Sequence, residues 1–171
     1  LCSLVPDAGR LTMSVLAEMD ARSGVSRYRI TEGYIVSRAR LSYEAGQLIL
    51  DGDPAARALV PPEVIRALTE LSAIGLRLRE RRMKRGALDL DVAETKATVD
   101  AEGNPLTVAR RARLGTMELI EEFMLLANLL VGEEGERRDG PFLFRVHPPP
   151  SLSKLAALEA MLAALGLPRL D

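Results

Sequence analysis

The chain has 171 residues, of which 47% are hydrophobic and 27% are charged, enough for one domain with a sizeable core. Its 23 Lys and Arg residues balance 24 Asp and Glu residues, so binding of nucleic acid would have to rest on a local cluster of cations. The single cysteine, Cys2, excludes an internal disulfide framework and a multi-cysteine metal site, and it fits a cytoplasmic, reducing compartment. We expect no signal peptide and no membrane-spanning segment, because a span needs about 20 apolar residues.

Alternating apolar and polar residues predict a long β-hairpin near the N-terminus. Residues 10–20 alternate in the manner of a half-buried antiparallel strand. Residues 21–24 supply a glycine-containing turn, and residues 25–41 are rich in β-forming side chains, so they predict the second strand. The alternation slips near Gly33, where we expect a β-bulge.

Two helices are predicted next. Ser42 is a candidate N-cap for a short helix that ends near Leu50. The sequence DGDP at residues 51–54 predicts a turn or loop. A proline pair opens a longer helix over residues 61–85, with apolar side chains facing the core, and Gly86 ends it.

The end of that long helix carries a dense group of cations. Five arginines and one lysine fall within nine residues, opposed only by Glu80. Arg77, Arg81 and Arg85 are spaced by four residues and so share one face. Because arginine binds phosphate oxygens in bidentate fashion, this face could contact phosphates. The alternative is a solvated helix end whose cations suit the negative end of the helix dipole.

A second hairpin is predicted from residues 87–99 and 106–111, joined by a turn at residues 100–104. Asp89 and Asp91 would lie on one face of its first strand, where two carboxylates could share a divalent cation. The alternative is that both simply lie on the hydrated face of the strand.

The sequence MELIEEFMLLANLLV, residues 117–131, predicts the helix around which the other elements pack. Within residues 123–131 only Asn128 is polar, so we expect a helix buried on all sides. Glu121 and Asn128 are seven residues apart and share a face. The residues alone leave Glu121 open between a paired structural carboxylate and part of a site. The helix is expected to end near Gly132, before a charged loop.

The C-terminal stretch predicts a short strand at residues 142–147 and a last helix that begins after the N-cap Ser151 and ends at Gly166. His147 is the only histidine, and G-x-S-x-G, P-loop and Rossmann motifs are missing, so the sequence supports neither a Ser–His hydrolase nor those nucleotide-binding folds. The predicted fold is α+β, with antiparallel hairpins packed on a buried central helix and further helices.

Five stretches follow one another along the chain: LCSLVPDAGRLTMSV, SRARLSYEAGQLIL, RRMKRGALDLDVAETK, LIEEFMLLANLLV and PFLFRVHPPPSLSKLAALEAMLAALGL. In this order they resemble the catalytic RNB domain of the RNase II/RNase R family of 3′-to-5′ exoribonucleases. In the family, a cluster of metal-binding aspartates precedes the first stretch, and an arginine in the motif T-S-P-I-R-x-Y follows the last. We therefore expect residues 1–171 to be an internal segment of a single RNB domain, without nuclease activity and without a stable fold when isolated.

The resemblance implies processive hydrolysis of single-stranded RNA with Mg²⁺, whose ligands would lie outside this segment. Glu121 matches a glutamate that positions the 3′-terminal nucleotide. Leu90 matches a position where several relatives carry a phenylalanine that clamps the last base, and leucine lacks the π-face whose stacking is worth about 1–3 kcal/mol per base. Arg145 and His147 belong to an R-V-H motif, where backbone or structural contacts are expected, and we group both with the RNA-binding residues.

In an RNA channel the cationic helix end gains a role, so Arg77, Arg81, Lys84 and Arg85 are predicted to contact RNA. The aspartate pair near residue 90 does not match the catalytic aspartates of the family, which disfavours a metal site there. Two alternatives remain: a catalytically inactive RNA-binding relative or scaffold that retains the fold, and an interaction domain without an RNA role. We expect a monomer with RNA as its partner and no membrane contact.

Overall fold

The computed structural model describes residues 3–89, 95–110, 113–138 and 140–168. The chain divides into two compact units, Leu1–Arg137 and Arg138–Asp171. The first unit contains two hairpins and four helices among its described residues, and the second contains one helix. Within the described ranges, none of the helices has the length and apolar character needed to cross a membrane.

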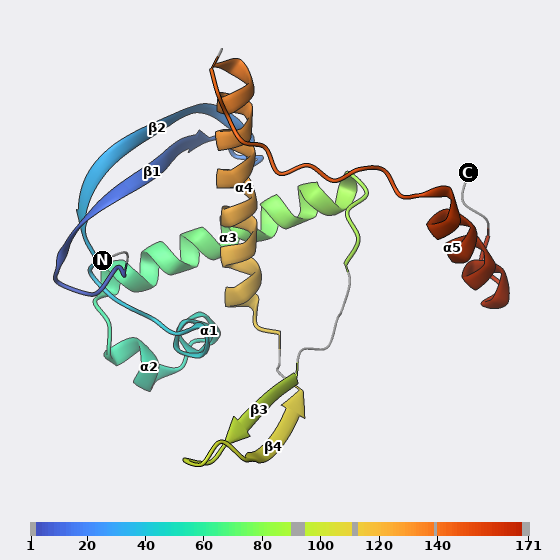
Figure 1. Ribbon diagram of the computed structural model, residues 1–171. Helices are drawn as coiled ribbons and strands as arrows, with labels where there is room; N and C mark the ends of the chain where they lie inside the picture. Colours follow the sequence, from blue (N-terminus) through green and yellow to red (C-terminus); the bar gives the residue numbers. More distant parts are fainter. Residues whose placement is uncertain (1–2, 90–94, 111–112, 139, 169–171) are drawn as a thin grey trace. The chain divides into compact units, whose positions relative to one another are not determined.

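The N-terminal hairpin consists of β1 (Gly9–Met19) and β2 (Val25–Val36), which pair antiparallel as a long curved ribbon (Figure 1). This confirms the predicted hairpin, but β2 ends five residues before residue 41. The bulge predicted at Gly33 is wrong, because the register runs unbroken there and shifts only between Glu18 and Met19. The shift lies beside a tight turn, in which the Asp20 carboxylate accepts backbone hydrogen bonds from Arg22 at 2.8 Å and Gly24 at 2.7 Å.

Two short helices follow the hairpin. The N-cap prediction for α1 (Tyr43–Asp51) is confirmed, since Ser42 Oγ accepts a hydrogen bond from the Ala45 N–H at 3.1 Å. Helix α2 (Pro54–Ala58) was not predicted from the sequence. Its N-terminus is capped by Asp53, whose side chain accepts from the Ala56 N–H at 2.7 Å. The DGDP sequence thus ends one helix and starts the next.

The two long helices are α3 (Pro62–Lys84) and α4 (Gly115–Arg137), which cross in the first unit (Figure 1). Gly75 allows their close approach, because a Cβ atom at this position would lie 2.9 Å from Leu119 Cδ1. The bounds of α3 confirm the prediction. The predicted end of α4 near Gly132 is wrong, since the helix continues to Arg137. A tertiary contact supports the added turns: Glu134 is buried and accepts a hydrogen bond from Tyr28 on β2.

The first unit has a thin apolar core. Ile49, Leu119 and Leu130 are its buried apolar side chains among the described residues. The prediction that α4 is buried on all sides is wrong, because Met124 and Leu129 are 59% and 52% exposed. In the described part of the chain, α4 contacts α1, α3 and β1, and its Glu134 meets Tyr28 of β2, but these elements leave part of its surface uncovered. Asn128 on this helix is also exposed.

The second hairpin consists of β3 (Thr95–Val99) and β4 (Pro105–Arg110). Its turn is built by Asp100, whose Oδ1 accepts from the backbone N–H groups of Asn104 at 2.8 Å and Glu102 at 3.0 Å. The hairpin is confirmed, but its first strand is shorter than predicted. Residues 87–89 have no regular secondary structure, and residues 90–94 lie outside the described ranges.

In the second unit, residues 141–150 have no regular secondary structure, so the strand predicted at residues 142–147 is wrong. A strand needs a partner for its backbone groups, and the pairing found in the described residues involves only β1–β4 and one bridge between Pro6 and Ser37. Helix α5 (Leu152–Ala164) is confirmed with its N-cap, since Ser151 Oγ accepts from the Lys154 N–H at 3.4 Å. Together the two units confirm the mixed α and β fold class.

Candidate functional site

A network of ion pairs joins the C-terminal half of α3 to the first turns of α4. Residues three or four positions apart share a helix face, so the spacing of the charges on each helix allows several pairs to form across the crossing. The network also takes in one side chain from each of the segments that connect these helices to β3 and β4. Its members are Arg79, Arg82, Asp89, Arg113, Glu118, Glu121 and Glu122.

Glu122 is the buried acid of this network, with 4% of its surface exposed. Arg82 donates to Glu122 Oε1 through Nε at 3.0 Å and through Nη2 at 2.6 Å. The hydrogen bond to Glu122 raises the pKa of the Arg82 guanidinium. Sequence reasoning missed this residue, because Glu121 and Glu122 are adjacent and only the packing of α4 decides which of them is buried.

Glu121 lies at the solvent-facing edge of the same network, and its side chain is 46% exposed. Its Oε1 is 3.4 Å from Arg82 Nη2, at the long end for a hydrogen bond, and its Oε2 is 3.7 Å from Arg113 Nη2. A carboxylate has about four lone-pair sites. Glu121 therefore keeps most of its capacity to accept hydrogen bonds from a ligand.

Asp89 is held by two arginines. Its Oδ2 is 2.7 Å from Arg79 Nη2, and its Oδ1 is 3.1 Å from Arg113 Nη1. These hydrogen bonds lower the pKa of Asp89, and the one from Arg79 has the larger effect. The Nε of Arg79 is buried and has no hydrogen-bond partner among the described residues, where it forms a 3.5 Å ion pair with Glu118 Oε2.

The predicted pairing of Asp89 with Asp91 is not seen, because Asp91 lies outside the described residues and Asp89 belongs to no strand. Within the described ranges, no group of three or more His, Cys, Asp or Glu residues is arranged to hold a metal ion. The carboxylates of the network are engaged by arginines instead.

The cationic residues predicted to contact RNA at the end of α3 divide into two pairs. Arg77 Nε donates to Ser23 Oγ at 2.9 Å, and Arg81 Nη1 donates to the Ser23 carbonyl oxygen. Both arginines therefore hold the turn of the β1–β2 hairpin, and Ser23 is 1% exposed. Lys84 and Arg85 are exposed at the end of α3, and their side chains form no hydrogen bond or ion pair with the described residues.

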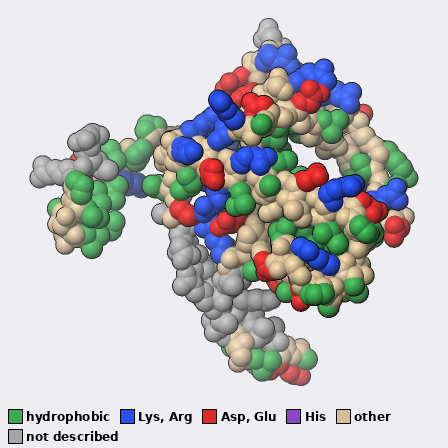
Figure 2. Space-filling model, turned by 180° about the vertical axis from the view of Figure 1, so that it is seen from behind, with side chains coloured by type: hydrophobic (Ala, Val, Ile, Leu, Met, Phe, Trp, Pro, Cys, Tyr) green, Lys and Arg blue, Asp and Glu red, His purple; other side chains and the backbone are tan. Residues whose placement is uncertain are grey.

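A cavity of about 430 Å³ lies between the hairpin, the end of α3 and α4. Arg81 and Arg85, both predicted from the sequence, line it together with Arg82 and Glu122. Its other wall is apolar and includes leucines of α4. Figure 2 shows Lys and Arg side chains interleaved with Asp and Glu side chains on one face of the molecule, in keeping with a balanced net charge of −1.

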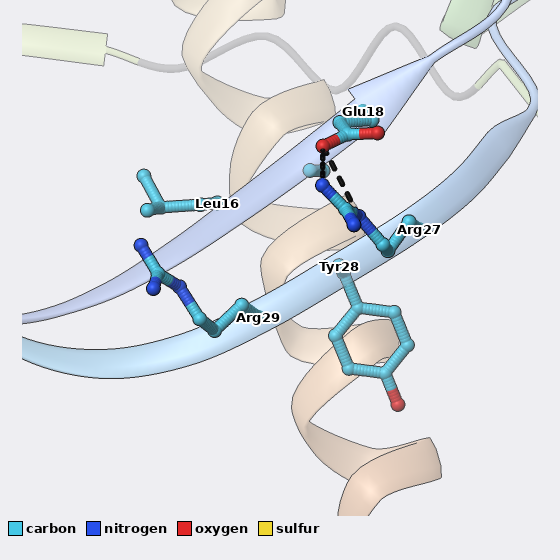
Figure 3. Close-up of a pocket in the computed structure, with 6 residues that line it drawn as sticks. Leu16, Glu18, Arg27, Tyr28 and Arg29 are labelled. Carbon is cyan, nitrogen blue, oxygen red and sulfur yellow. Dashed lines mark hydrogen bonds and ion pairs between the residues drawn. The ribbon is translucent and has the colours of Figure 1, made fainter.

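A second hollow, of about 500 Å³, lies against the hairpin itself (Figure 3). Glu18 accepts a 3.1 Å hydrogen bond from Arg27 Nε, and Tyr28 points to the opposite face of β2. Tyr28 Oη donates to Glu134 Oε2 at 3.2 Å. Burial, followed by this hydrogen bond, raises the pKa of Tyr28. The tyrosine thus attaches the hairpin to the last turns of α4.

The remaining predicted site residues lie outside the described ranges or in the second unit. Leu90 lies outside the described residues. Arg145 and His147 belong to the second unit, where both are exposed in a segment without regular secondary structure. The first unit therefore brings together Arg81 and Arg85 at the cavity, with Glu121 beside Arg82.

Residues 1–169 match the RNB domain. The chain is 38% identical over 170 residues to Ribonuclease R of Thermotoga maritima, an alignment that covers 98% of this chain and 23% of that protein. It is 32% identical over 167 residues to Ribonuclease R of Escherichia coli, covering 98% of this chain and 20% of that protein.

A solved structure of an RNase R is also similar to this chain. The structure of Mycoplasma genitalium RNase R in complex with ribose methylated single-stranded RNA is similar, with a TM-score of 0.91 at 25% identity. The alignment covers 100% of this chain and 26% of that one. The chain thus spans about a quarter or less of the length of the relatives it matches.

Proposed function

The chain belongs to the RNB domain family, and from this membership we propose that it is an internal segment of a processive exoribonuclease that hydrolyses single-stranded RNA from its 3′ end. The observation that carries the proposal is the likeness over the whole chain to an RNase R whose structure contains single-stranded RNA. The identity to Ribonuclease R proteins supports it independently. A cytoplasmic, monomeric enzyme is part of the proposal, and the single cysteine is compatible with such a reducing location.

Glu121 is proposed to position the 3′-terminal nucleotide. Its carboxylate is 46% exposed, and its contacts with the described residues are two long ones, so its oxygens can accept hydrogen bonds from ribose hydroxyls. The 2′-hydroxyl distinguishes RNA from DNA, and its contact with Glu121 would favour RNA.

The cationic end of α3 is proposed to contact the RNA backbone. Arg85 and Lys84 have side chains without partners among the described residues, and they are therefore the best placed to bind phosphate oxygens. Arg77 and Arg81 are engaged with Ser23, but a guanidinium carries five N–H donors and can bind a phosphate as well. Leu90, Arg145 and His147 stay in the proposed RNA-binding set on the resemblance alone.

Mg²⁺ is the cofactor proposed for the whole enzyme, where a divalent ion would activate water and neutralise charge on the scissile phosphate. The described residues do not supply a ligand set for it, since no group of three or more candidate ligands converges there. The contribution proposed for this chain is therefore binding and positioning of RNA, and the metal ligands would belong to other parts of the enzyme.

The test uses the full-length protein that contains this chain, incubated with Mg²⁺ and a single-stranded RNA labelled at its 5′ end. Progressive shortening of the labelled RNA, together with release of mononucleotides, is expected. A blocked 3′ end should prevent both. RNA binding without shortening would contradict the exonuclease and would instead support the inactive RNA-binding relative.

A further inference from the structure

We infer that Arg82 is a positioning residue, which is anchored by the buried carboxylate of Glu122 and fixes the orientation of the Glu121 carboxylate toward the RNA. This inference rests on the proposed function, because it concerns how Glu121 is held for its contact with the 3′-terminal nucleotide. It adds two residues, Arg82 and Glu122, that sequence reasoning did not assign to the site.

Arg82 is anchored on its inner side by Glu122. Its Nε and Nη2 atoms both bond Glu122 Oε1, at 3.0 and 2.6 Å, and Nε lies 3.3 Å from Oε2. The Glu122 side chain is only 5% exposed, whereas that of Arg82 is 31% exposed. A buried carboxylate is strongly destabilising without its partner, so this pair stays formed. The guanidinium plane of Arg82 is therefore fixed from the protein side.

On its outer side, Arg82 contacts Glu121. Its Nη2 atom, which bonds Glu122, also lies 3.4 Å from Glu121 Oε1. One nitrogen thus touches a buried and an exposed carboxylate from consecutive residues of α4. Because an exposed glutamate otherwise samples several rotamers, an anchored cation on one of its oxygens restricts where the other oxygen points.

Arg113 is a second cation near Glu121. Arg113 Nη2 lies farther away, at 3.7 Å from Glu121 Oε2, and its side chain is 37% exposed. Arg113 also bonds Asp89 at 3.1 Å and pairs with Glu118 at 3.1 Å. Both partners of Arg113, Asp89 and Glu118, are at least partly exposed, so Arg113 restricts the Glu121 side chain less than Arg82 does.

The test is a double-mutant cycle in the full-length enzyme with Arg82→Lys and Glu121→Gln. Lysine keeps a cation for buried Glu122, but its ammonium sits on a flexible stem and lacks the planar fork by which Arg82 bonds Glu122 through Nε and Nη2 together, so its direction toward Glu121 is not fixed. The measurement is kcat/KM on a single-stranded RNA that ends in a ribonucleotide and on the same RNA with a 2′-deoxy 3′-terminal residue. The thermal midpoint of each variant is measured alongside.

We expect Arg82→Lys to lower kcat/KM for the ribose-ended RNA by about 10- to 100-fold, since small misplacements of a positioning group have effects of this size. The ratio between the ribose and deoxy substrates should fall. In the Glu121→Gln background, Arg82→Lys should cause little further loss of this ratio. Arg79→Lys is the matched control: Arg79 lies one turn away on α3 and pairs with Asp89 and Glu118, and its substitution should leave the ratio unchanged.

The inference is overturned if Arg82→Lys lowers kcat/KM equally for both substrates, or if its effect multiplies with that of Glu121→Gln, because Arg82 would then serve only to hold α3 against α4. If the Glu121→Gln enzyme is active and has the wild-type ratio of kcat/KM between the ribose and deoxy substrates, the inference about Arg82 is wrong, but the proposed exonuclease activity is not contradicted. If the wild-type enzyme does not shorten RNA, the proposed function fails first.

Discussion

Arg77 Nε donates a hydrogen bond of 2.9 Å to Ser23 Oγ, so α3 holds the turn of a hairpin that lies 54 residues earlier in the sequence. Arg81, one helical turn further along α3, bonds the carbonyl oxygen of the same serine. Two arginines that look like phosphate ligands in the sequence therefore have a structural task, and RNA binding and folding can be separated by mutation.

Replacing Ser23 tests this structural task. Ser23→Ala removes the acceptor of the Arg77 hydrogen bond and should lower the free energy of unfolding by about 1.5–3 kcal/mol. Ser23 has a positive φ of 59°. Glycine relieves the strain of this left-handed conformation, so Ser23→Gly should cost about 1 kcal/mol less than Ser23→Ala. Urea unfolding gives both values, and a neutral Ser23→Ala variant would show that the hydrogen bond does not matter.

Neutralising Lys84 and Arg85 together should weaken RNA binding without affecting the fold, because their side chains have no partners among the described residues. The slope of log K against log salt should become shallower by about 0.7 for each phosphate of a single strand that the protein no longer neutralises. Filter binding at several salt concentrations measures it. Arg66→Gln, an exposed cation near the start of α3, is the control for charge alone. Equal effects from both variants would argue against a specific contact.

Tyr28 should make stability depend on alkaline pH. Its pKa is raised, first by burial and then by the hydrogen bond to Glu134. The folded state thus favours the neutral phenol, and this stabilisation is complete below the ordinary pKa of about 10 and is lost as the pH rises through the folded value. Urea unfolding between neutral and alkaline pH should therefore show a smaller loss of stability in Tyr28→Phe than in the wild type. Parallel curves for the two proteins would contradict this assignment.

Asp89 should respond at the acid end. Its pKa is lowered by hydrogen bonds from Arg79 and Arg113, so the stabilisation is present above the ordinary pKa of about 3.9 and is lost as the pH falls through the lower folded value. Arg113→Gln should move the Asp89 pKa back toward its ordinary value. An NMR titration of the side-chain carboxyl carbon measures the change. An unchanged titration would mean that Arg113 does not contact Asp89 in solution.

Gly75 and Gly132 should respond oppositely to alanine. Both are helical, but a Cβ at Gly75 would lie 2.9 Å from Leu119 Cδ1, whereas one at Gly132 would meet nothing within 4 Å. Gly132→Ala should raise the free energy of unfolding by about 0.5–1 kcal/mol through helix propensity. Gly75→Ala should lose that gain to the contact with Leu119, and Gly75→Val should be destabilising by about 1–3 kcal/mol. Equal gains from both alanine variants would contradict the close approach of α3 and α4.

The sequence by itself determined the features whose causes are local. Ser42 and Ser151 accept hydrogen bonds from backbone groups three residues ahead, and the glycine turns end the helices because they supply left-handed backbone; each cause lies within one turn of the chain. The alternation of apolar and polar residues along β1 is likewise a local pattern, and it predicted this strand of the hairpin. The ordered motifs also predicted the family, which the match over residues 1–169 confirms.

Only the tertiary structure decided which charges are free. The sequence does not show which of the adjacent Glu121 and Glu122 is buried. The crossing of α3 and α4 buries Glu122 against Arg82 and leaves Glu121 exposed. The same crossing, with the hairpin packed beside it, assigns Arg77 to Ser23 and leaves Arg85 at a cavity. The physical reason is that burial and ion pairing depend on which residues distant in sequence meet, and residue spacing within one helix carries no information about that partner.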